Sequence, residues 1–514
     1  MPRYAAIDIG SNSVRMMAAE VEANGPAGQP PRVLVEDRQV TRLGASVFQG
    51  GSISKEALDF LCATLERQVA LFRPLDVLAL RAVATAAVRD ASNREEFLER
   101  TARVIGQPVE IISGQEEARL IHLGVESRWP HPKDRIMIAD IGGGSAEIIE
   151  AEDGVQVAAF SRPLGAVRLH AVFLKHDPPD RTELRRLDEF VAEKLAVVFR
   201  KIERGGFARF IGTSATAAAV VSAANRIPRA RREAADRQRA SIGQIRKLER
   251  NLVGMTLEER RAVPGLGPRR AEIIVPGVIV LRHVLEWYDA PFLWYSTAGV
   301  RDGIIRDLAE RGVGRERACM DAEQRAQVEQ FARRFAVDLK HARKVAEHSR
   351  QLFHALEPWH KLKPEEGRLL EAAAYLRDVG HLISDTSHHK HSHYIVANSD
   401  LAGFTDAEKS KLALLCRYHR KSMPSARHEE FVKLGEDEQR TVLLLAPLLR
   451  IADAIDRSRD QRVESIRCEL RAGGALLTLE ALDDASLEVW AAERCSEDFR
   501  NVYQKGLAVA AVRL

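Results

Sequence analysis

Two short loops of similar composition are the places in this sequence where chemistry could occur. The first reads Asp8-Ile-Gly-Ser-Asn-Ser13, and the second reads Asp140-Ile-Gly-Gly-Gly-Ser145 and continues to Glu147. Glycine lets a backbone approach an anion closely, and successive N–H groups can form an anion-binding concavity. Aspartate and glutamate offer the hard oxygen ligands that magnesium on phosphates accepts. The repeated Asp-to-Ser spacing predicts a duplicated unit with a phosphate chain held between the copies.

The glycine run matches neither of the common phosphate-binding loops. It lacks the Gly-Lys-Ser/Thr ending of a Walker loop. Ile148 and Ile149 resume a strand pattern where a dinucleotide fingerprint would begin a helix. A tight hairpin in which the glycines serve turn geometry alone is the simplest alternative, and the second copy at Asp8 makes it unattractive.

Ser113, Glu116 and Glu117 stand at the start of a predicted helix. Ser113 with Glu116 three residues later has the spacing of a capping box, which gives Glu116 a structural task. Glu117 has no such explanation, although both carboxylates would also favour the positive end of a helix. Glu117 is therefore a candidate functional carboxylate.

Two further segments could meet an anion. Gly212-Thr-Ser-Ala-Thr216 follows a strand pattern and begins a helix, which is a natural anion site but also ordinary turn and cap chemistry. Arg226–Arg239 is strongly basic and is either a solvated loop or a segment that steers a polyanion.

The composition is that of a folded protein with several domains. The 514 residues are 45% hydrophobic and 29% charged, and the net charge of +4 is too small to indicate nucleic-acid binding. No run approaches the ~18 apolar residues of a membrane span, and no signal peptide is recognised. Five scattered cysteines without a Cys-x-x-Cys pair indicate reduced thiols in a cytoplasmic protein.

The order of strand and helix patterns predicts an α/β architecture for the first part of the chain. Strand patterns over Tyr4–Ile9 and Val14–Val21 flank the first loop, and later strands alternate with helices such as Ser54–Phe72. From Asp321 to Arg459 the pattern is almost entirely helical and rich in histidine. One helix and four short strands are predicted beyond it, the strands at Val463–Leu470, Leu476–Leu482, Leu487–Trp490 and Leu507–Val512.

Four motifs in this order resemble the exopolyphosphatase/guanosine pentaphosphate phosphatase (Ppx/GppA) family. They are the Asp8 loop, Ser113-Gly-Gln-Glu-Glu-Ala-Arg-Leu120, the Asp140 loop through Glu147, and Gly212–Thr216, and the resemblance runs from residue 4 to about 310. The histidine-rich part resembles the long form of that family at His388-His-Lys-His-Ser392, Asn398-Ser-Asp-Leu-Ala-Gly-Phe404 and Arg417-Tyr-His-Arg-Lys421.

The resemblance implies two ribonuclease-H-like lobes of the actin-like ATPase superfamily, with the substrate in the cleft between them. We expect the first lobe at 1–125 and the second at 126–312. An all-α HD-like domain at 318–460 and a small α+β C-terminal domain at 461–514 would follow. The long form also suggests a homodimer.

The resemblance implies a role for each residue of the loops. Glu117 would activate the attacking water. Magnesium, or manganese in its place, would be held by Asp140 and Glu147 with Asp8 nearby. Phosphoryl transfer needs positioning of the water and neutralisation of charge more than covalent help, which these residue types supply. The phosphates would be bound by Ser11, Asn12, Ser13, Gly142, Gly143, Gly144, Ser145, Arg89 and Arg270.

The helical part resembles HD metal phosphohydrolases, whose sites use a first histidine, an adjacent His-Asp pair and a later aspartate. His348 and Asp453 have the positions of the first and last ligands. Arg377 stands where the paired histidine before Asp378 should be, and a guanidinium cannot ligate a metal. A working HD site is therefore not expected, and the histidines would line a path for an acidic chain or serve as polar packing.

The sequence favours a magnesium-dependent exopolyphosphatase that hydrolyses the terminal phosphate of inorganic polyphosphate. Hydrolysis of guanosine pentaphosphate (pppGpp) to ppGpp by the same site is the close alternative, because both activities can coexist in the family that the sequence resembles. No motif in the sequence reads a guanine base. A sensor that binds polyphosphate or the alarmone without turnover is another alternative, against which the intact Glu117, Asp140 and Glu147 argue. A sugar kinase fits less well, because water activation suits hydrolysis.

Overall fold

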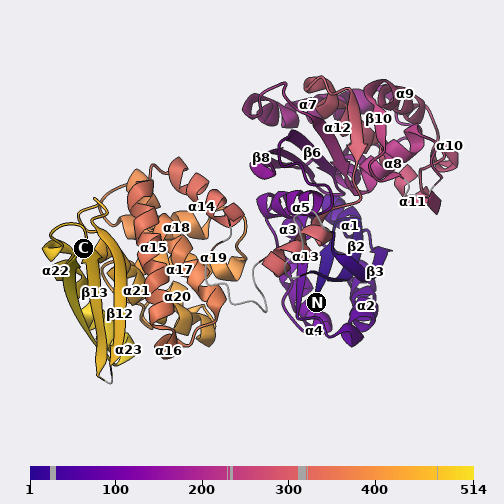
Figure 1. Cartoon of the computed structure of the whole chain (residues 1–514). Coiled ribbons are helices and arrows are strands. Elements are labelled where there is room, and N and C mark those ends of the chain that lie inside the picture. Colours follow the sequence, from indigo (N-terminus) through magenta and orange to yellow (C-terminus); the bar gives the residue numbers. More distant parts are fainter. Residues whose placement is uncertain (23–29, 229, 232–234, 311–319, 321, 472) are drawn as a thin grey trace. The chain divides into compact units, whose positions relative to one another are not determined.

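The protein is described by a computed structural model that covers the chain except residues 23–29, 229, 232–234, 311–319, 321 and 472. It divides into two compact units, Met1–Glu310 and Arg311–Leu514 (Figure 1). The finer division at 125/126 and 460/461 stays a prediction.

The first unit begins with a mixed sheet in the order β3-β2-β1-β4-β5. Strands β1, β2 and β3 form an antiparallel meander, and β4 and β5 continue parallel to β1. The strands are β1 (Arg3–Ile9), β2 (Ser13–Glu20), β3 (Arg32–Val40), β4 (Ala79–Ala84) and β5 (Glu110–Ile111). The helices are α1 (Leu43–Gly50), α2 (Lys55–Phe72), η1 (Arg73–Leu75), α3 (Ala86–Asp90), α4 (Arg94–Ile105) and α5 (Gly114–Arg128).

The second sheet of this unit has the order β10-β11-β9-β6-β7-β8. Its strands are β6 (Arg135–Ile141), β7 (Ala146–Glu152), β8 (Val155–Arg162), β9 (Arg209–Thr213), β10 (Arg239–Ser241) and β11 (Phe292–Tyr295). Its helices are α6 (Ala166–Phe173), α7 (Arg181–Lys201), α8 (Ser214–Ala224), α9 (Ile242–Val253), α10 (Leu257–Ala262), α11 (Pro268–Ala271), α12 (Ile274–Trp287) and α13 (Val300–Glu310).

The two sheets repeat one topology. An antiparallel β6-β7-β8 meander is extended in parallel by β9 and β11, as β1-β2-β3 is extended by β4 and β5, and β10 is added at the edge. The N–H of Gly10 donates to the carbonyl of Ser13 (3.1 Å), and the N–H of Gly142 donates to that of Ser145 (3.0 Å). The predicted α/β class and the duplicated strand-loop-strand unit are therefore confirmed.

Helix α5 lies between the two sheets and carries Glu116 and Glu117. It packs against β7 and β8 on one side and against α13 on the other. A Cβ at Gly303 would lie 1.8 Å from the carbonyl oxygen of Leu120, and a Cβ at Gly124 would lie 2.3 Å from that of Gly299. Glycine is required at both positions because the α5 and α13 backbones approach so closely.

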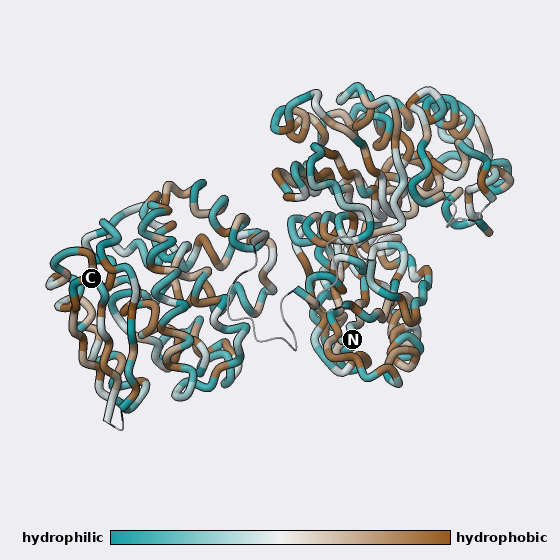
Figure 2. The backbone as a smooth tube through the Cα atoms, viewed as in Figure 1, coloured by the Kyte–Doolittle hydropathy of each residue, from teal (hydrophilic) through white to brown (hydrophobic). Residues whose placement is uncertain are grey.

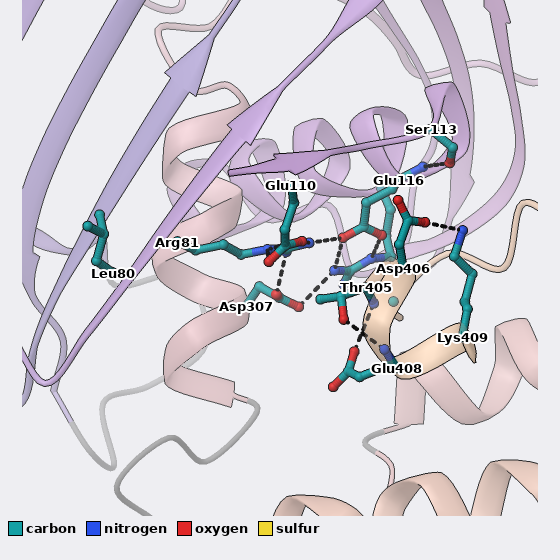
Figure 3. A network of polar contacts seen from close by, with 12 residues as sticks. Leu80, Arg81, Glu110, Ser113, Glu116, Asp307, Thr405, Asp406, Glu408 and Lys409 are labelled. Atoms are coloured by element: carbon teal, nitrogen blue, oxygen red, sulfur yellow. Dashed lines mark hydrogen bonds and ion pairs between the residues drawn. The ribbon is translucent and has the colours of Figure 1, made fainter. Parts of the chain in front are cut away.

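A buried ion network fixes α5 to β4 and α13 (Figure 3). Arg81 donates to Glu116 (3.0 Å) and Asp307 (2.9 Å), and its Nη2 also donates to Glu110 (2.9 Å). Arg119 donates to Glu116 (2.8 Å) and to Asp307 (2.8 Å). The predicted capping box is therefore only half formed: Ser113 accepts the Glu116 N–H, but the Glu116 carboxylate binds the two arginines instead.

The second unit is helical at first and ends in a three-stranded sheet with the order β12-β13-β14. Its helices are α14 (Ala322–Arg334), α15 (Leu339–Ala355), α16 (Glu357–His360), α17 (Pro364–Leu376), η3 (Val379–Leu382), α18 (His388–Ala397), α19 (Asp406–Tyr418), α20 (Glu429–Val432), α21 (Glu436–Ile455), α22 (Ser486–Glu493) and α23 (Ser496–Tyr503). Its strands are β12 (Val463–Arg471), β13 (Gly474–Ala481) and β14 (Gly506–Arg513). One apolar cluster joins the helices to the sheet.

The strand predicted at Leu487–Trp490 is wrong, because these residues belong to α22. The buried positions of α22 are Glu488, Ala491 and Ala492, which have helical spacing. Because the buried Glu488 is charged, the pattern of apolar residues alone did not indicate this helical face. The Glu488 carboxylate accepts the N–H of Ser458 (3.1 Å). The HD-like relationship of the helical part stays a prediction.

Apolar and polar residues alternate along the helices of both units (Figure 2). Within the described part of the chain, no helix is long and apolar enough to cross a membrane.

The buried ion network gives a stability prediction. Asp307→Asn removes a carboxylate that pairs with the buried guanidiniums of Arg81 and Arg119. We therefore expect the free energy of unfolding to fall by about 3 kcal/mol. Glu99→Gln removes an exposed pair with Arg103 and should change it by less than about 0.5 kcal/mol. Urea unfolding measures both, and equal effects would contradict the assignment of the network to the core.

Candidate active site

A cavity of about 1120 Å³ lies between the two sheets of the first unit, and both hairpin loops line it. It brings together eleven of the thirteen predicted site residues: Asp8, Ser11, Asn12, Ser13, Glu117, Asp140, Gly142, Gly143, Gly144, Ser145 and Arg270. Glu147 and Arg89 are not among the described residues that line it. Glu147 pairs with Asp140 across β6 and β7, and Arg89 donates to the Glu117 carboxylate (3.3 Å) and to Ile112 (2.6 Å).

The two hairpin loops contact each other. A Cβ at Gly144 would lie 2.6 Å from Ser11 Oγ, and one at Gly143 would lie 3.2 Å from the backbone nitrogen of Asn12. A Cβ at Gly165 would lie 2.3 Å from the Gly144 carbonyl carbon. The glycines are therefore needed for loop-to-loop contact as well as for turn geometry.

Glu117 is a buried carboxylate at the wall of the cavity, 8% exposed. Burial raises the pKa of Glu117 to about 7, with Asp8 and Asp140 adding to the effect and Arg89 opposing it. A carboxylate with a pKa near neutrality can accept a proton from a bound water. The position and pKa of Glu117 thus suit a general base.

Three other carboxylates share this environment. Burial is the largest cause of the raised pKa of Asp8, Asp140 and Glu147. Repulsion from Glu117 and Asp140 raises the pKa of Glu147 further. Four buried acids in one region call for a cation or for proton-sharing.

The third loop supports Asp140. Thr213 Oγ1 donates to Asp140 Oδ2 (2.6 Å), and Thr216 Oγ1 donates to the carbonyl of Ile141 (2.7 Å). Arg270 Nη1 donates to Thr216 Oγ1 (3.3 Å). The weak signal of Gly212–Thr216 therefore marks a segment that holds the Asp140 loop, and Ser214 itself lines the cavity.

Several residues that line the cavity were not predicted from the sequence. Arg15 lies opposite Asp8 in the β1–β2 register, so the hairpin itself could have indicated it. Arg301 had no local signal, because the return of α13 to the first sheet places it there. Arg231 belongs to the basic segment and lines the cavity, while residues 229 and 232–234 lie outside the described part.

In the second unit, the buried Arg377 lies between Asp453 and His341. Its Nε donates to Asp453 (2.7 Å), and its Nη2 lies 2.5 Å from Nε2 of His341. His341 Nε2 also lies 3.4 Å from Asp453 Oδ1. His348, which the sequence suggested, instead has its Nδ1 3.5 Å from Gln351.

Comparison with known families identifies the chain. The Ppx/GppA phosphatase family model matches residues 21–311, which is more than half of the chain, and its domain III model matches residues 324–492. The chain belongs to the Ppx/GppA phosphatase family. Its reaction class is therefore hydrolysis of a phosphate-bearing substrate.

Solved structures of Ppx/GppA proteins resemble about 60% of the chain. The Aquifex aeolicus family member is 28% identical over 60% of this chain and 98% of its own, with a TM-score of 0.52. An exopolyphosphatase-like protein is 29% identical over 60% and 98%, with a TM-score of 0.56. An exopolyphosphatase from Cytophaga hutchinsonii is 25% identical over 60% and 98%, with a TM-score of 0.54.

The contact between the loops gives a mutational prediction. Gly165→Ala places a methyl group against the Gly143–Gly144 backbone, so we expect a loss of ~1–3 kcal/mol in unfolding free energy and a lower kcat. Gly50→Ala, where a Cβ meets nothing within 4 Å, is the control and should leave both values close to wild type. Wild-type turnover in Gly165→Ala would show that the loops tolerate separation.

Proposed function

We propose that this Ppx/GppA phosphatase is an exopolyphosphatase that removes terminal orthophosphate from inorganic polyphosphate. The observation that carries the proposal is Glu117, a buried carboxylate with a pKa of about 7 in a cavity lined by both anion-binding hairpins. Hydrolysis needs a water in line with the terminal phosphorus and a group that takes its proton. Glu117 would hold that water and accept the proton.

The hairpins and nearby arginines would bind the phosphates. Backbone N–H groups of Gly142–Ser145 and Ser11–Ser13 are suited to the oxygens of the terminal groups. Guanidiniums bind phosphate oxygens in bidentate fashion and lower the negative charge that repels the attacking water. The arginines that line the cavity are Arg15, Arg38, Arg128, Arg231, Arg270 and Arg301.

We propose magnesium as the cofactor, with manganese as a substitute. Asp140 and Glu147 supply buried carboxylates with raised pKa values, which a cation would favour in their ionised form, and Asp8 is the third. Among the described residues, the carboxylate oxygens of Asp8, Asp140 and Glu147 do not form a group in which all ligand atoms lie within 4.8 Å of one another. Magnesium usually keeps waters and substrate phosphates among its ligands, so a loose carboxylate set fits it. When bound, the ion would neutralise phosphate oxygens.

A preference for polyphosphate over pppGpp rests on the lining of the cavity. Among the described lining residues, Tyr295 is the single aromatic side chain, and it is 4% exposed. A nucleotide base usually stacks on an exposed ring, whereas a phosphate chain needs only charge and N–H groups. The exopolyphosphatase from Cytophaga hutchinsonii supports the same choice.

Glu117→Gln tests the catalytic role. Because glutamine cannot take a proton from water, we expect kcat to fall by a factor of ~100 or more. The affinity of Glu117→Gln for polyphosphate, measured by isothermal titration calorimetry, should remain close to that of the wild type. A Glu117→Gln protein with near-normal turnover would refute the role of Glu117.

The pH profile separates this role from a structural one. A base must be ionised, so kcat/KM of the wild type should fall as the pH drops below about 7, the raised pKa of Glu117. The residual activity of Glu117→Gln should lack this acidic limb. An unchanged limb in the variant would assign it to another group.

The substrate is tested by measuring orthophosphate release from polyphosphate and from pppGpp side by side, with and without magnesium. We expect faster, magnesium-dependent release from polyphosphate. Release from pppGpp alone would assign the nucleotide as substrate, and binding without release from either would indicate a sensor.

A further inference from the structure

We infer that the second unit holds a divalent transition-metal ion through Asp378, His388 and His419, with His381 as a fourth ligand on the exposed side. This site shares Asp378 with the HD-type position but uses none of its other residues. It rests on contacts in the Arg311–Leu514 unit alone and is independent of the proposed phosphatase activity.

The distances between the four side chains match those across one metal ion. Asp378 Oδ1 lies 3.6 Å from His381 Nε2, 3.7 Å from His388 Nε2 and 3.9 Å from His419 Nε2. The two Nε2 atoms of His388 and His419 are 3.2 Å apart. Two ligands of a tetrahedral zinc ion with bonds of 2.0–2.1 Å stand about 3.3 Å from each other. Asp378, His381 and His388 also form one of the compact ligand groups of the described residues.

The second nitrogen of each imidazole is already engaged. His419 Nδ1 lies 2.7 Å from the carbonyl of Cys416, and His388 Nδ1 lies 3.2 Å from that of Asp385. His381 Nδ1 lies 2.7 Å from the Asp385 carboxylate. A ring nitrogen beside such an oxygen carries the proton, which leaves the Nε2 lone pair for a ligand. Metal-binding histidines in proteins are oriented by the same kind of contact.

The 3.2 Å contact between the Nε2 atoms of His388 and His419 is one that a bound cation would stabilise. With both Nδ1 atoms as donors, the two Nε2 atoms face each other as lone pairs. Both residues are nearly buried, His388 at 4% and His419 at 6% exposed, so water is a poor substitute for the ion.

The arginines around Asp378 shape the site without filling it. Arg377 Nη2 (3.5 Å) and Arg459 Nη2 (3.9 Å) face Oδ2 of Asp378, which leaves Oδ1 for the metal. Arg420 Nη1 lies 3.2 and 3.4 Å from the two nitrogens of His388. Nearly equal distances place it against the ring face, and its side chain is exposed and able to move away.

The ligand set selects the class of metal. Imidazole nitrogen suits zinc, iron, nickel and copper, whereas magnesium and calcium prefer oxygen. The other compact group of described residues, His176, Asp180 and Glu183, is explained by helix capping. Asp180 accepts the N–H groups of Thr182 and Glu183, and Glu183 accepts those of Lys175 and Asp180.

Zinc binding by the full-length protein tests the inference. The chelator-stripped protein is titrated with zinc in excess magnesium, which occupies sites made of oxygen alone. Bound zinc is then measured by mass spectrometry after dialysis, and Tm by calorimetry. We expect about one more zinc per chain in the wild type than in His388→Gln or His419→Gln, and a Tm that rises with zinc only where the ion binds. His391→Gln, on the same helix but outside the ligand group, is the matched control and should keep the zinc.

Two exposed variants cover the case in which a buried substitution disturbs folding. His381→Gln should weaken zinc binding by about tenfold or more through loss of one ligand. Arg420→Gln should tighten it, because a competing positive charge is removed. Cobalt in place of zinc should give a visible d–d absorption that His381→Gln alters and His391→Gln does not. Equal zinc content and equal Tm shifts in wild type, His388→Gln and His381→Gln would overturn the proposal.

Discussion

The burial of charge around helix α5 is the constraint on which the first unit depends. Arg81 and Arg119 are almost inaccessible to water, and each requires the carboxylates of Glu116 and Asp307. An unpaired buried charge is strongly unfavourable, so β4, α5 and α13 can adopt only the arrangement that completes the network. The glycine contacts between α5 and α13 hold the same arrangement by close packing. The position of Glu117 in the cavity follows from both.

The adjacent residues Glu116 and Glu117 on this helix have opposite pKa shifts because their surroundings differ. Burial opposes the ionisation of Glu116, but Arg119 and Arg81 outweigh it and lower its pKa to about 2. Burial and the neighbouring acids raise the pKa of Glu117 to about 7. One residue is thereby kept as a permanent anion of the core, and its neighbour becomes able to exchange a proton near neutral pH.

The second unit places a side-chain cation, Arg377, next to the proposed metal site at Asp378. Arg377 pairs with Asp453 and His341, so a side-chain cation neutralises the Asp453 carboxylate. Next to it, Asp378 and three imidazoles direct oxygen and nitrogen lone pairs to one point. A fixed guanidinium and an exchangeable ion can share one carboxylate because its two oxygens face opposite ways.

The sequence alone determined the features that depend on local spacing. Two Asp-to-Ser turns at equal intervals predicted the hairpins, since a strand-loop-strand pattern is set by neighbouring residues. The motif order predicted the family, and the family models confirm it. Glu117 could be separated from Glu116 because only the latter had a capping explanation.

Tertiary structure alone decided the features that depend on distant segments. The true partners of Glu116 come from β4 and α13, and Arg301 reaches the cavity because α13 returns to the first sheet. His341 rather than His348 faces Asp453 because helix packing selects one turn of α15. Leu487–Trp490 became helix because Glu488, not an apolar residue, completes its buried face. In each case the deciding free energy comes from burial or pairing across long sequence separations, which local spacing does not encode.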